Sequence, residues 1–181
     1  MTKQFESTKV VLTVPQADNP KGSVKWDSKD DLKRGIPLVT FPSFYMDAPH
    51  EPTSGAGHKT ASLSDSPITA YIVYDKTAAR VLTPLVQGDN LKQVVITETG
   101  RADDAQEVKI RSLTMTDPFL VEVMWYWDES LFTALTPGGV VALSFKYTRV
   151  DLLAQEFDPV TGASKGHKTN GFDKTHSTSV S

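Results

Sequence analysis

The sequence contains no cysteine, no long apolar run and no large excess of charge of either sign. The absence of cysteine excludes disulfide bonds, thiolate catalysis and cysteine-ligated metal. No segment reaches the roughly 18 uninterrupted apolar residues that a transmembrane helix needs. The formal net charge of -3 provides no electrostatic attraction to nucleic acid or to an anionic membrane. We therefore expect no nucleic-acid binding and no membrane insertion, and we expect stability to come from packing and assembly.

The first residues, MTKQFESTK, lack the apolar core and the small-residue cleavage site of a secretory signal. The expected localisation is therefore the cytoplasm. Any later secretion would have to proceed without a cleaved signal peptide.

Motifs for the common enzymatic chemistries are also missing. The sequence has no GxxxxGK, no GxGxxG after a strand, no HExxH and no GxSxG. The four histidines have no partner at the spacing of helical metal ligands. The aspartate pairs at 30–31 and 103–104 fall in polar turns, which lack the burial that catalytic carboxylates need. We therefore expect that the protein is not an enzyme and that it has no cofactor and no metal site.

Alternation of apolar and polar residues predicts an all-β domain of about eight strands. Most connections are too short for parallel crossovers, so the strands should be antiparallel. Changes of parity predict a β-bulge near Ser112 and a bend at Asp117-Pro118. The segment 141–148 alternates most cleanly and predicts a half-buried strand. The expected strands are residues 7–14, 36–45, 67–74, 91–98, 107–116, 119–127, 141–148 and 150–157.

One short helix is expected after residue 74. Asp75 or Thr77 can accept hydrogen bonds from the free N–H groups of its first turn, and Gly88 can end it. Its apolar stripe comprises Ala78, Val81, Leu82, Leu85 and Val86. Pro84 costs roughly 3 kcal/mol inside a helix, so we expect a kink and burial of the stripe against a sheet.

The chain is predicted to be one domain, residues 1–160, followed by a polar C-terminal tail, residues 161–181. The domain contains a long loop at 46–66 that has no segment able to enter a core. Loops beyond about 12 to 15 residues are uncommon in compact domains unless they have a function or are flexible. This loop therefore needs an explanation. A linker between domains is one alternative, but too little chain precedes the loop to form a domain.

The segment 119–127 carries apolar side chains on both faces of its predicted strand. A stacking platform for sugars or bases would use its exposed aromatic residues, but packing against the core and against another subunit uses the same residue types more often. The second apolar face is more than a monomer of this size needs, and it favours a protein partner.

The order of several segments resembles the haemolysin-coregulated protein (Hcp) family. The segments are PITAYIVYD, KTAARVLTPLVQG, LKQVVIT, EVKIRSLT, VVALSFKYTRVDLLAQEFD and TNGFD, and they span Ile68 to Asp173. The matching positions are Asp75, Lys76, Leu82, Leu85, Gly88, Val141, Leu143 and Phe145. Pro84 departs from the family, which usually has a good helix former there, and the N-terminal third matches only in outline.

The resemblance implies two packed antiparallel sheets that form a barrel-like sandwich with one α-helix on its side, similar to phage tail-tube proteins. It also implies a homo-hexameric ring that stacks into the inner tube of the type VI secretion system, with sheath, spike and effector proteins as partners. Residues expected at subunit or ring contacts are His50, His58, Lys59, Val123, Trp125 and Trp127. The alternatives are a phage tail-tube protein, a β-sandwich ligand-binding module and an enzyme with an unrecognised site.

Overall fold

The structure is a computed structural model of the 181-residue chain. The part of the chain that the structure describes forms ten strands: β1 (Thr8–Thr13), β2 (Ile36–Pro37), β3 (Ile68–Val73), β4 (Gln93–Arg101), β5 (Glu107–Thr116), β6 (Phe119–Tyr126), β7 (Val140–Lys146), β8 (Arg149–Phe157), β9 (Ser164–Asp173) and β10 (Thr178–Val180). The residues that the structure describes are 8–15, 35–43, 66–75, 78–79, 82, 86, 91–101, 107–126, 139–157, 164–173 and 178–180. Within these ranges no helix is both long enough and apolar enough to cross a bilayer.

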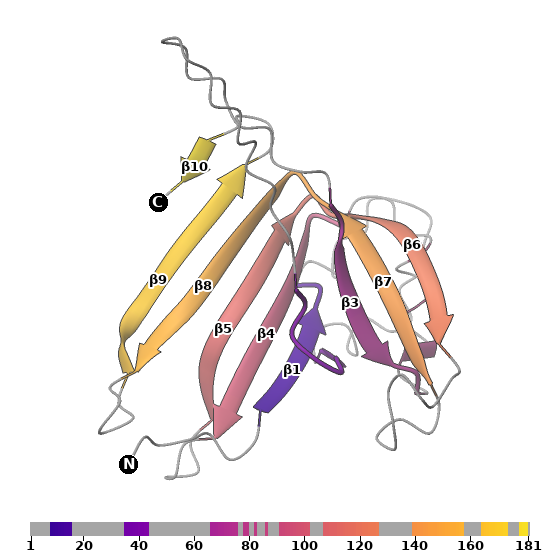
Figure 1. Cartoon of the computed structure of the whole chain (residues 1–181), viewed down its shortest axis with the longest axis horizontal. Helices are drawn as coiled ribbons and strands as arrows, with labels where there is room; N and C mark the ends of the chain where they lie inside the picture. The colour runs from indigo at the N-terminus through magenta and orange to yellow at the C-terminus, as the bar shows by residue number, and fades with distance from the viewer. Residues whose placement is uncertain are drawn as a thin grey trace, which may run out of the picture.

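The strands form two antiparallel sheets, as predicted. The larger sheet has the order β10-β9-β8-β5-β4-β1-β2, and the smaller has the order β3-β7-β6. Figure 1 shows the larger sheet on the left and the smaller on the right, with β9 and β6 at opposite ends of the molecule. The segment after β2 joins the sheets, because Leu38 N–H donates to Val10 O and Val39 N–H donates to Tyr71 O.

Two neighbouring strands pass from one sheet to the other at a shared corner. β5 continues into β6 through Asp117-Pro118, and β7 continues into β8 through residues 147–148. The corner is held by Thr148, whose N–H and Oγ1 both donate to Thr116 O at 3.1 and 3.0 Å. Asp117 adopts a φ of 44°, a left-handed conformation that aspartate tolerates better than most residues. The predicted bend is therefore confirmed.

The core lies between the two sheets and is built from the alternate residues of their facing strands. Its fully buried large side chains are Leu12, Ile36, Ile68, Ile72, Ile96, Leu113, Met115, Leu143 and Phe145. The predicted face of β3, carrying Ile68, Ala70 and Ile72, is buried completely. Each such side chain stabilises the fold by about 1.5 to 3 kcal/mol through the area it removes from water.

β7 is buried on both faces, so the half-buried strand expected at this position is wrong. Val140, Ala142 and Ser144 on its outward face are only 1, 4 and 3% exposed. The reason is position: β7 lies between β3 and β6, so the larger side chains of both neighbours flank its small outward residues. The alternation in the sequence reflects the polarity of the side chains. It does not show that the flanking strands cover the outward face of β7.

The bulge expected near Ser112 is present in β5. The register with β4 shifts where Glu98 pairs with Arg111 but Thr99 pairs with Lys109, which leaves Ile110 as the extra residue. This insertion brings Val108 to the same face as Leu113. The bulge therefore explains why apolar residues of β5 change from even to odd positions along the sequence and still lie on one face of the strand.

The expected helix remains a prediction, because most of its residues lie outside the described ranges. Ala78, Ala79, Leu82 and Val86 are helical. The Asp75 carboxylate accepts a hydrogen bond from Ala78 N–H at 2.8 Å, as an N-cap should. Ala78 and Leu82 of the apolar stripe are buried in the core, whereas Val86 is 55% exposed. The Pro84 kink lies outside the described residues.

The C-terminal part of the chain contributes more regular structure than its composition indicated. β9, within the segment expected to be a polar tail, pairs with the whole length of β8 from Arg149 to Phe157. Its residues 165–170 are exposed, and only Gly171 is buried. A strand exposed on both faces has no apolar alternation, which explains why the sequence pattern did not reveal it.

Gly35 and Gly166 offer a test of how the start of β2 is packed. Both have positive φ, but a Cβ at Gly35 would lie 3.0 Å from Val11 Cβ, whereas one at Gly166 would meet nothing within 4 Å. We expect Gly35→Ala to lower the free energy of unfolding by about 2 to 4 kcal/mol through strain and overlap, and Gly166→Ala by about 1 to 2 through strain alone. Urea denaturation measures both, and equal losses would contradict the packing at Gly35.

Candidate assembly surface and groove

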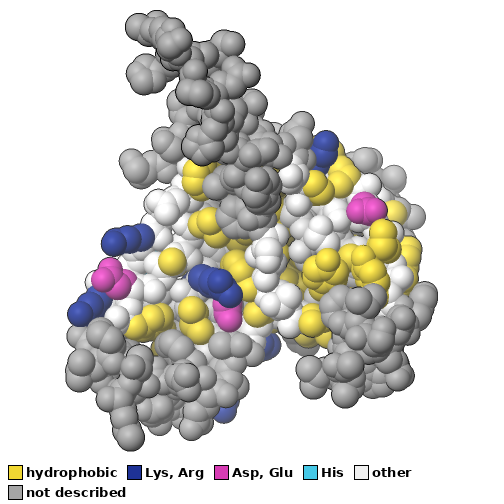
Figure 2. Space-filling model, in the orientation of Figure 1, with side chains coloured by type: hydrophobic (Ala, Val, Ile, Leu, Met, Phe, Trp, Pro, Cys, Tyr) yellow, Lys and Arg dark blue, Asp and Glu magenta, His cyan; other side chains and the backbone are white. Residues whose placement is uncertain are grey.

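Strand β6 forms an exposed apolar edge of the smaller sheet. The exposed large hydrophobic side chains of the described residues number six, and four belong to β6: Phe119, Val121, Met124 and Trp125. β6 pairs with β7 on one side and with no other described strand. Exposed edges carry free backbone N–H and C=O groups that can pair with another chain. Figure 2 shows hydrophobic side chains gathered over this sheet.

The faces of β6 are not those predicted by strict alternation. The register with β7 shifts between Leu120 and Glu122, so Leu120 and Val123 lie opposite the inward residues Phe145 and Leu143. Phe119 therefore lies on the face opposite to Val123, although strict alternation along the strand would place both residues on one face. The bulge leaves apolar groups on both faces of β6.

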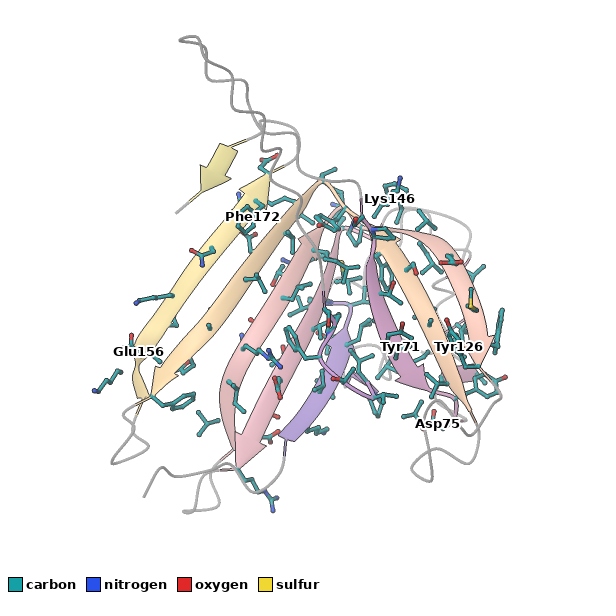
Figure 3. All side chains as sticks on the ribbon, viewed as in Figure 1. Tyr71, Asp75, Tyr126, Lys146, Glu156 and Phe172 are labelled. Carbon is teal, nitrogen blue, oxygen red and sulfur yellow. The ribbon has the colours of Figure 1, made fainter. Side chains whose placement is uncertain are left out.

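The outward face of the smaller sheet also carries a small polar network beside an aromatic pair. Ser144 Oγ donates to Glu122 Oε2 at 3.3 Å and lies 3.0 Å from Thr69 Oγ1. The rings of Tyr71 and Tyr126 lie 6.3 Å apart at 53°, and Figure 3 shows them on neighbouring parts of this sheet. Because Ser144 is buried and its polar partners are side chains, the network orders the sheet and offers no nucleophile to solvent.

The predicted contact residues fall in different places. Val123 is half-buried and packs against the core, whereas Trp125, although opposite inward-facing Val141, is 45% exposed. His50, His58, Lys59 and Trp127 lie outside the described residues. The structure thus brings Val123 and Trp125 together on β6, and their role in contacts stays a prediction.

A buried charge on the larger sheet organises its inner face. Glu98 on β4, 12% exposed in its side chain, accepts a hydrogen bond from Arg111 Nε. The Arg111 guanidinium lies over the Phe41 ring, 4.3 Å from its centroid. A cation over an aromatic ring is stabilised by the ring quadrupole. This contact joins the segment after β2 to β5, and sequence patterning gave no signal for it.

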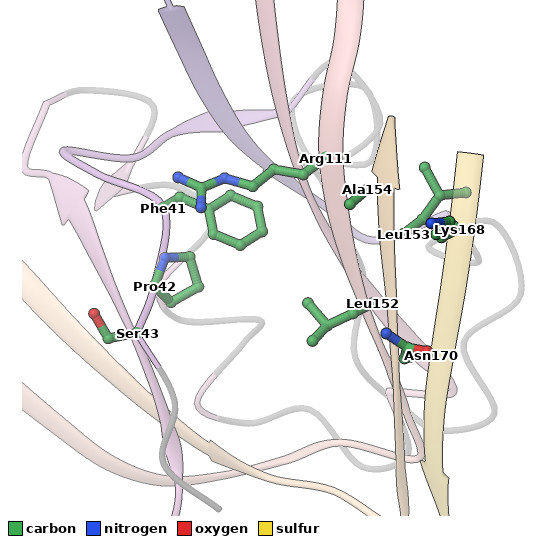
Figure 4. Close-up of a pocket in the computed structure, with 9 residues that line it drawn as sticks. All are labelled: Phe41, Pro42, Ser43, Arg111, Leu152, Leu153, Ala154, Lys168 and Asn170. Atoms are coloured by element: carbon green, nitrogen blue, oxygen red, sulfur yellow. The ribbon is translucent and has the colours of Figure 1, made fainter. Parts of the chain in front are cut away.

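A groove of about 610 Å³ lies between the segment 41–43 and strands β5, β8 and β9. Figure 4 shows Phe41 and Pro42 forming one side of the groove and Lys168 and Asn170 on β9 forming the other. Leu152 and Ala154 on β8 lie between them. Sequence reasoning missed this groove, because its residues are spread over distant parts of the chain.

Other charged groups have structural partners. Arg149 donates hydrogen bonds from Nε and Nη2 to the Asp151 carboxylate at 2.7 to 3.0 Å. The hydrogen bond and the charge of Asp151 raise the pKa of Arg149, so this cation persists throughout the ordinary pH range. The described residues contain no group of three or more histidine, aspartate or glutamate side chains placed to hold a metal.

The architecture can now be compared with known proteins. No protein-family model matches the chain, and no curated protein matches its sequence. A solved structure described as a type six secretion system protein matches with a TM-score of 0.66 and 13% identity, covering 96% of this chain and 100% of that chain. Hcp1 from Salmonella typhimurium matches with a TM-score of 0.55 and 13% identity, covering 96% and 99% of the two chains.

Hcp1 from E. coli EAEC 042 matches with a TM-score of 0.56 and 14% identity, covering 92% of this chain and 97% of that chain. The chain therefore has the fold of Hcp proteins over nearly its full length. The order of the segments along the sequence predicted this fold. The low identity explains why the likeness is visible in structure and not in whole-sequence comparison.

The Arg111–Glu98 pair can be tested by removing one or both charges. Arg111→Met leaves the poorly exposed Glu98 carboxylate without a partner, so we expect the free energy of unfolding to fall by about 2 to 3 kcal/mol. Arg111→Met combined with Glu98→Gln should recover most of this loss, because no unpaired charge remains. Chemical denaturation of both variants provides the measurement, and a double variant as unstable as the single one would refute the ion-pair explanation.

Proposed function

We propose that this chain is a structural subunit of the inner tube of the type VI secretion system. In this proposal it assembles into homo-hexameric rings, and the rings stack into a tube that carries effector proteins. The sheath and spike proteins of the apparatus are its further partners. The chain acts by assembly and has no catalytic role.

The single observation that supports this proposal best is the apolar edge of β6 on a chain with the Hcp fold. A lone copy leaves Phe119, Val121, Met124 and Trp125 between 43 and 53% exposed. Burying apolar area stabilises an interface by roughly 25 cal/mol per Å², before the costs of association are subtracted. A neighbouring subunit that covers this edge would remove its apolar side chains from water.

The geometry of the edge favours a ring. β6 lies at one end of the molecule and β9 at the other (Figure 1), and the two edges differ in composition. A contact between unlike surfaces is heterologous, and repetition of such a contact closes into a ring when the rotation between subunits allows it. Pairing of the β6 edge with the β6 edge of a second copy would instead give a two-fold dimer.

Transport of this protein out of the cytoplasm would follow from the same proposal. A tube propelled through a contractile sheath leaves the cell as an assembly, so its subunit requires no cleaved signal peptide. A tail-tube protein of a phage or phage-derived particle would use the same fold, and genes for sheath and baseplate proteins beside this gene would identify the system.

The β6 edge can be tested with a matched pair of charge substitutions. Trp125→Glu introduces a carboxylate that the ring would have to desolvate, which costs several kcal/mol per subunit. We expect native mass spectrometry to show a six-subunit species for the wild type, and monomers for Trp125→Glu. Val86→Glu, a similarly exposed apolar site away from β6, should leave the rings intact. A wild type that stays monomeric at high concentration would disprove the proposal.

The loop at 46–66 can be tested separately, because we propose that it contacts the next ring in the stack. Deleting residues 52–57 should leave hexamers unchanged and shorten the tubes seen in electron micrographs. An extended arm can add strand-like contacts to an adjacent subunit, and shortening it removes them. Tubes of wild-type length would show that stacking does not depend on this segment.

A further inference from the structure

The groove between the segment 41–43 and β9 has a charge that differs from that of the whole chain. The protein has a net charge of -3. The described residues that line the groove include two cations, Arg111 and Lys168, and no carboxylate. Figure 2, in the same orientation as Figure 1, shows cationic side chains on the larger sheet. Such a lining attracts an anionic ligand and disfavours a cationic one.

The partners of the two cations leave both able to contact a ligand. Arg111 is bound to Glu98 through Nε, and its side chain is still 49% exposed. The side chain of Lys168 is 82% exposed, and its carboxylate neighbour, Glu156, lies 4.0 Å away and is itself 57% exposed. An exposed pair at this distance contributes at most about 1 kcal/mol. An incoming carboxylate can therefore displace Glu156 from Lys168 at small cost.

The strand register places a small residue between the two cations. Ala154 on β8 pairs with Arg111 on β5 and with Lys168 on β9. Adjacent strands are roughly 4.8 Å apart, so the two cationic residues stand about 10 Å apart with only a methyl group between them. The next row pairs Leu152 with Asn170. The floor thus offers an anion site beside an apolar surface.

We propose that this groove binds an extended acidic segment of a partner protein, in which aspartate or glutamate alternates with apolar residues. An acidic side chain would lie over Ala154 between Lys168 and Arg111. A neighbouring apolar side chain would pack against Leu152 and Phe41. Asn170 and Ser43, which also line the groove, would supply hydrogen bonds to the backbone of the segment.

A peptide fits these features better than the other anionic polymers. Nucleic acid requires a row of cations along its phosphates, and the described residues of the groove supply only two. An apolar floor with a few polar groups around it is typical of sites that bind the side chains of a ligand. The inference does not depend on ring assembly, since every residue of the groove belongs to one chain.

Fluorescence anisotropy with the full-length protein and a rhodamine-labelled peptide, LDLELD, tests the proposal. We expect saturable binding with a dissociation constant on the order of 10 to 500 μM, and no binding of LKLKLK. Lys168→Glu should weaken binding by at least about tenfold. Lys165→Glu makes the same change of charge on β9 outside the groove, and it should change the affinity by less than about twofold.

Ala154→Trp provides a second variant, because it fills the floor without changing any charge. It should abolish peptide binding while thermal unfolding remains close to that of the wild type. No binding of LDLELD, equal binding of LKLKLK, or equal effects of Lys168→Glu and Lys165→Glu would each overturn the proposal. Binding of decanoate in place of the peptide would also overturn it, since the site would then recognise a free amphiphile.

Discussion

The shared corner between the sheets is the constraint on which the rest of the structure depends. Because β5 runs into β6 and β7 runs into β8, one long antiparallel pair supplies strands to both sheets. The bifurcated contact of Thr148 with Thr116 O and the positive φ of Asp117 fix the turn between them. The relative placement of the sheets, and therefore the core between them, follows from this bend.

The same corner sets which surfaces remain uncovered. It directs β6 away from the larger sheet, so β6 ends as an edge with one paired neighbour. Away from the corner, Ala154 on β8 and residues 165–170 on β9 are exposed, whereas Val150 near the corner is buried in the core. The apolar edge and the groove therefore have a common origin, although one is proposed to meet a copy of the chain and the other an acidic segment.

Much of the fold could be predicted from the sequence. A strand that is buried on one face alternates apolar and polar residues, and this alternation is visible in the sequence. The inward face of β3, the bulge of β5 and the bend at Asp117 were all read from parity. The burial of Ala142 in β7 could not be predicted, because β7 is buried on both faces. β9 could not be predicted from alternation, because most of its residues are exposed on both faces. In these two strands the neighbours, and not the residue types, decide what each side chain meets.

The candidate sites were less predictable for a different physical reason. Trp125 was recognised because a large apolar side chain in a two-faced strand has few uses other than packing. The Arg111 contact with Phe41 depends on residues 70 positions apart, so no local pattern encodes it. The groove combines residues from the segment 41–43 and from β5, β8 and β9, and only the assembled sheet reveals that its two cations flank an alanine.

The composition of β9 has a consequence for unwanted strand pairing between copies of the chain. Beyond its short pairing with β10 at residues 171–173, it presents Lys165, His167 and Lys168 along an exposed strand. Lysine along such a margin discourages another strand from docking, because the ammonium groups resist dehydration. Strand pairing along this part of β9 is therefore disfavoured, whereas β6, with the sequence FLVEVMWY, has no lysine along its edge to oppose a strand of another chain.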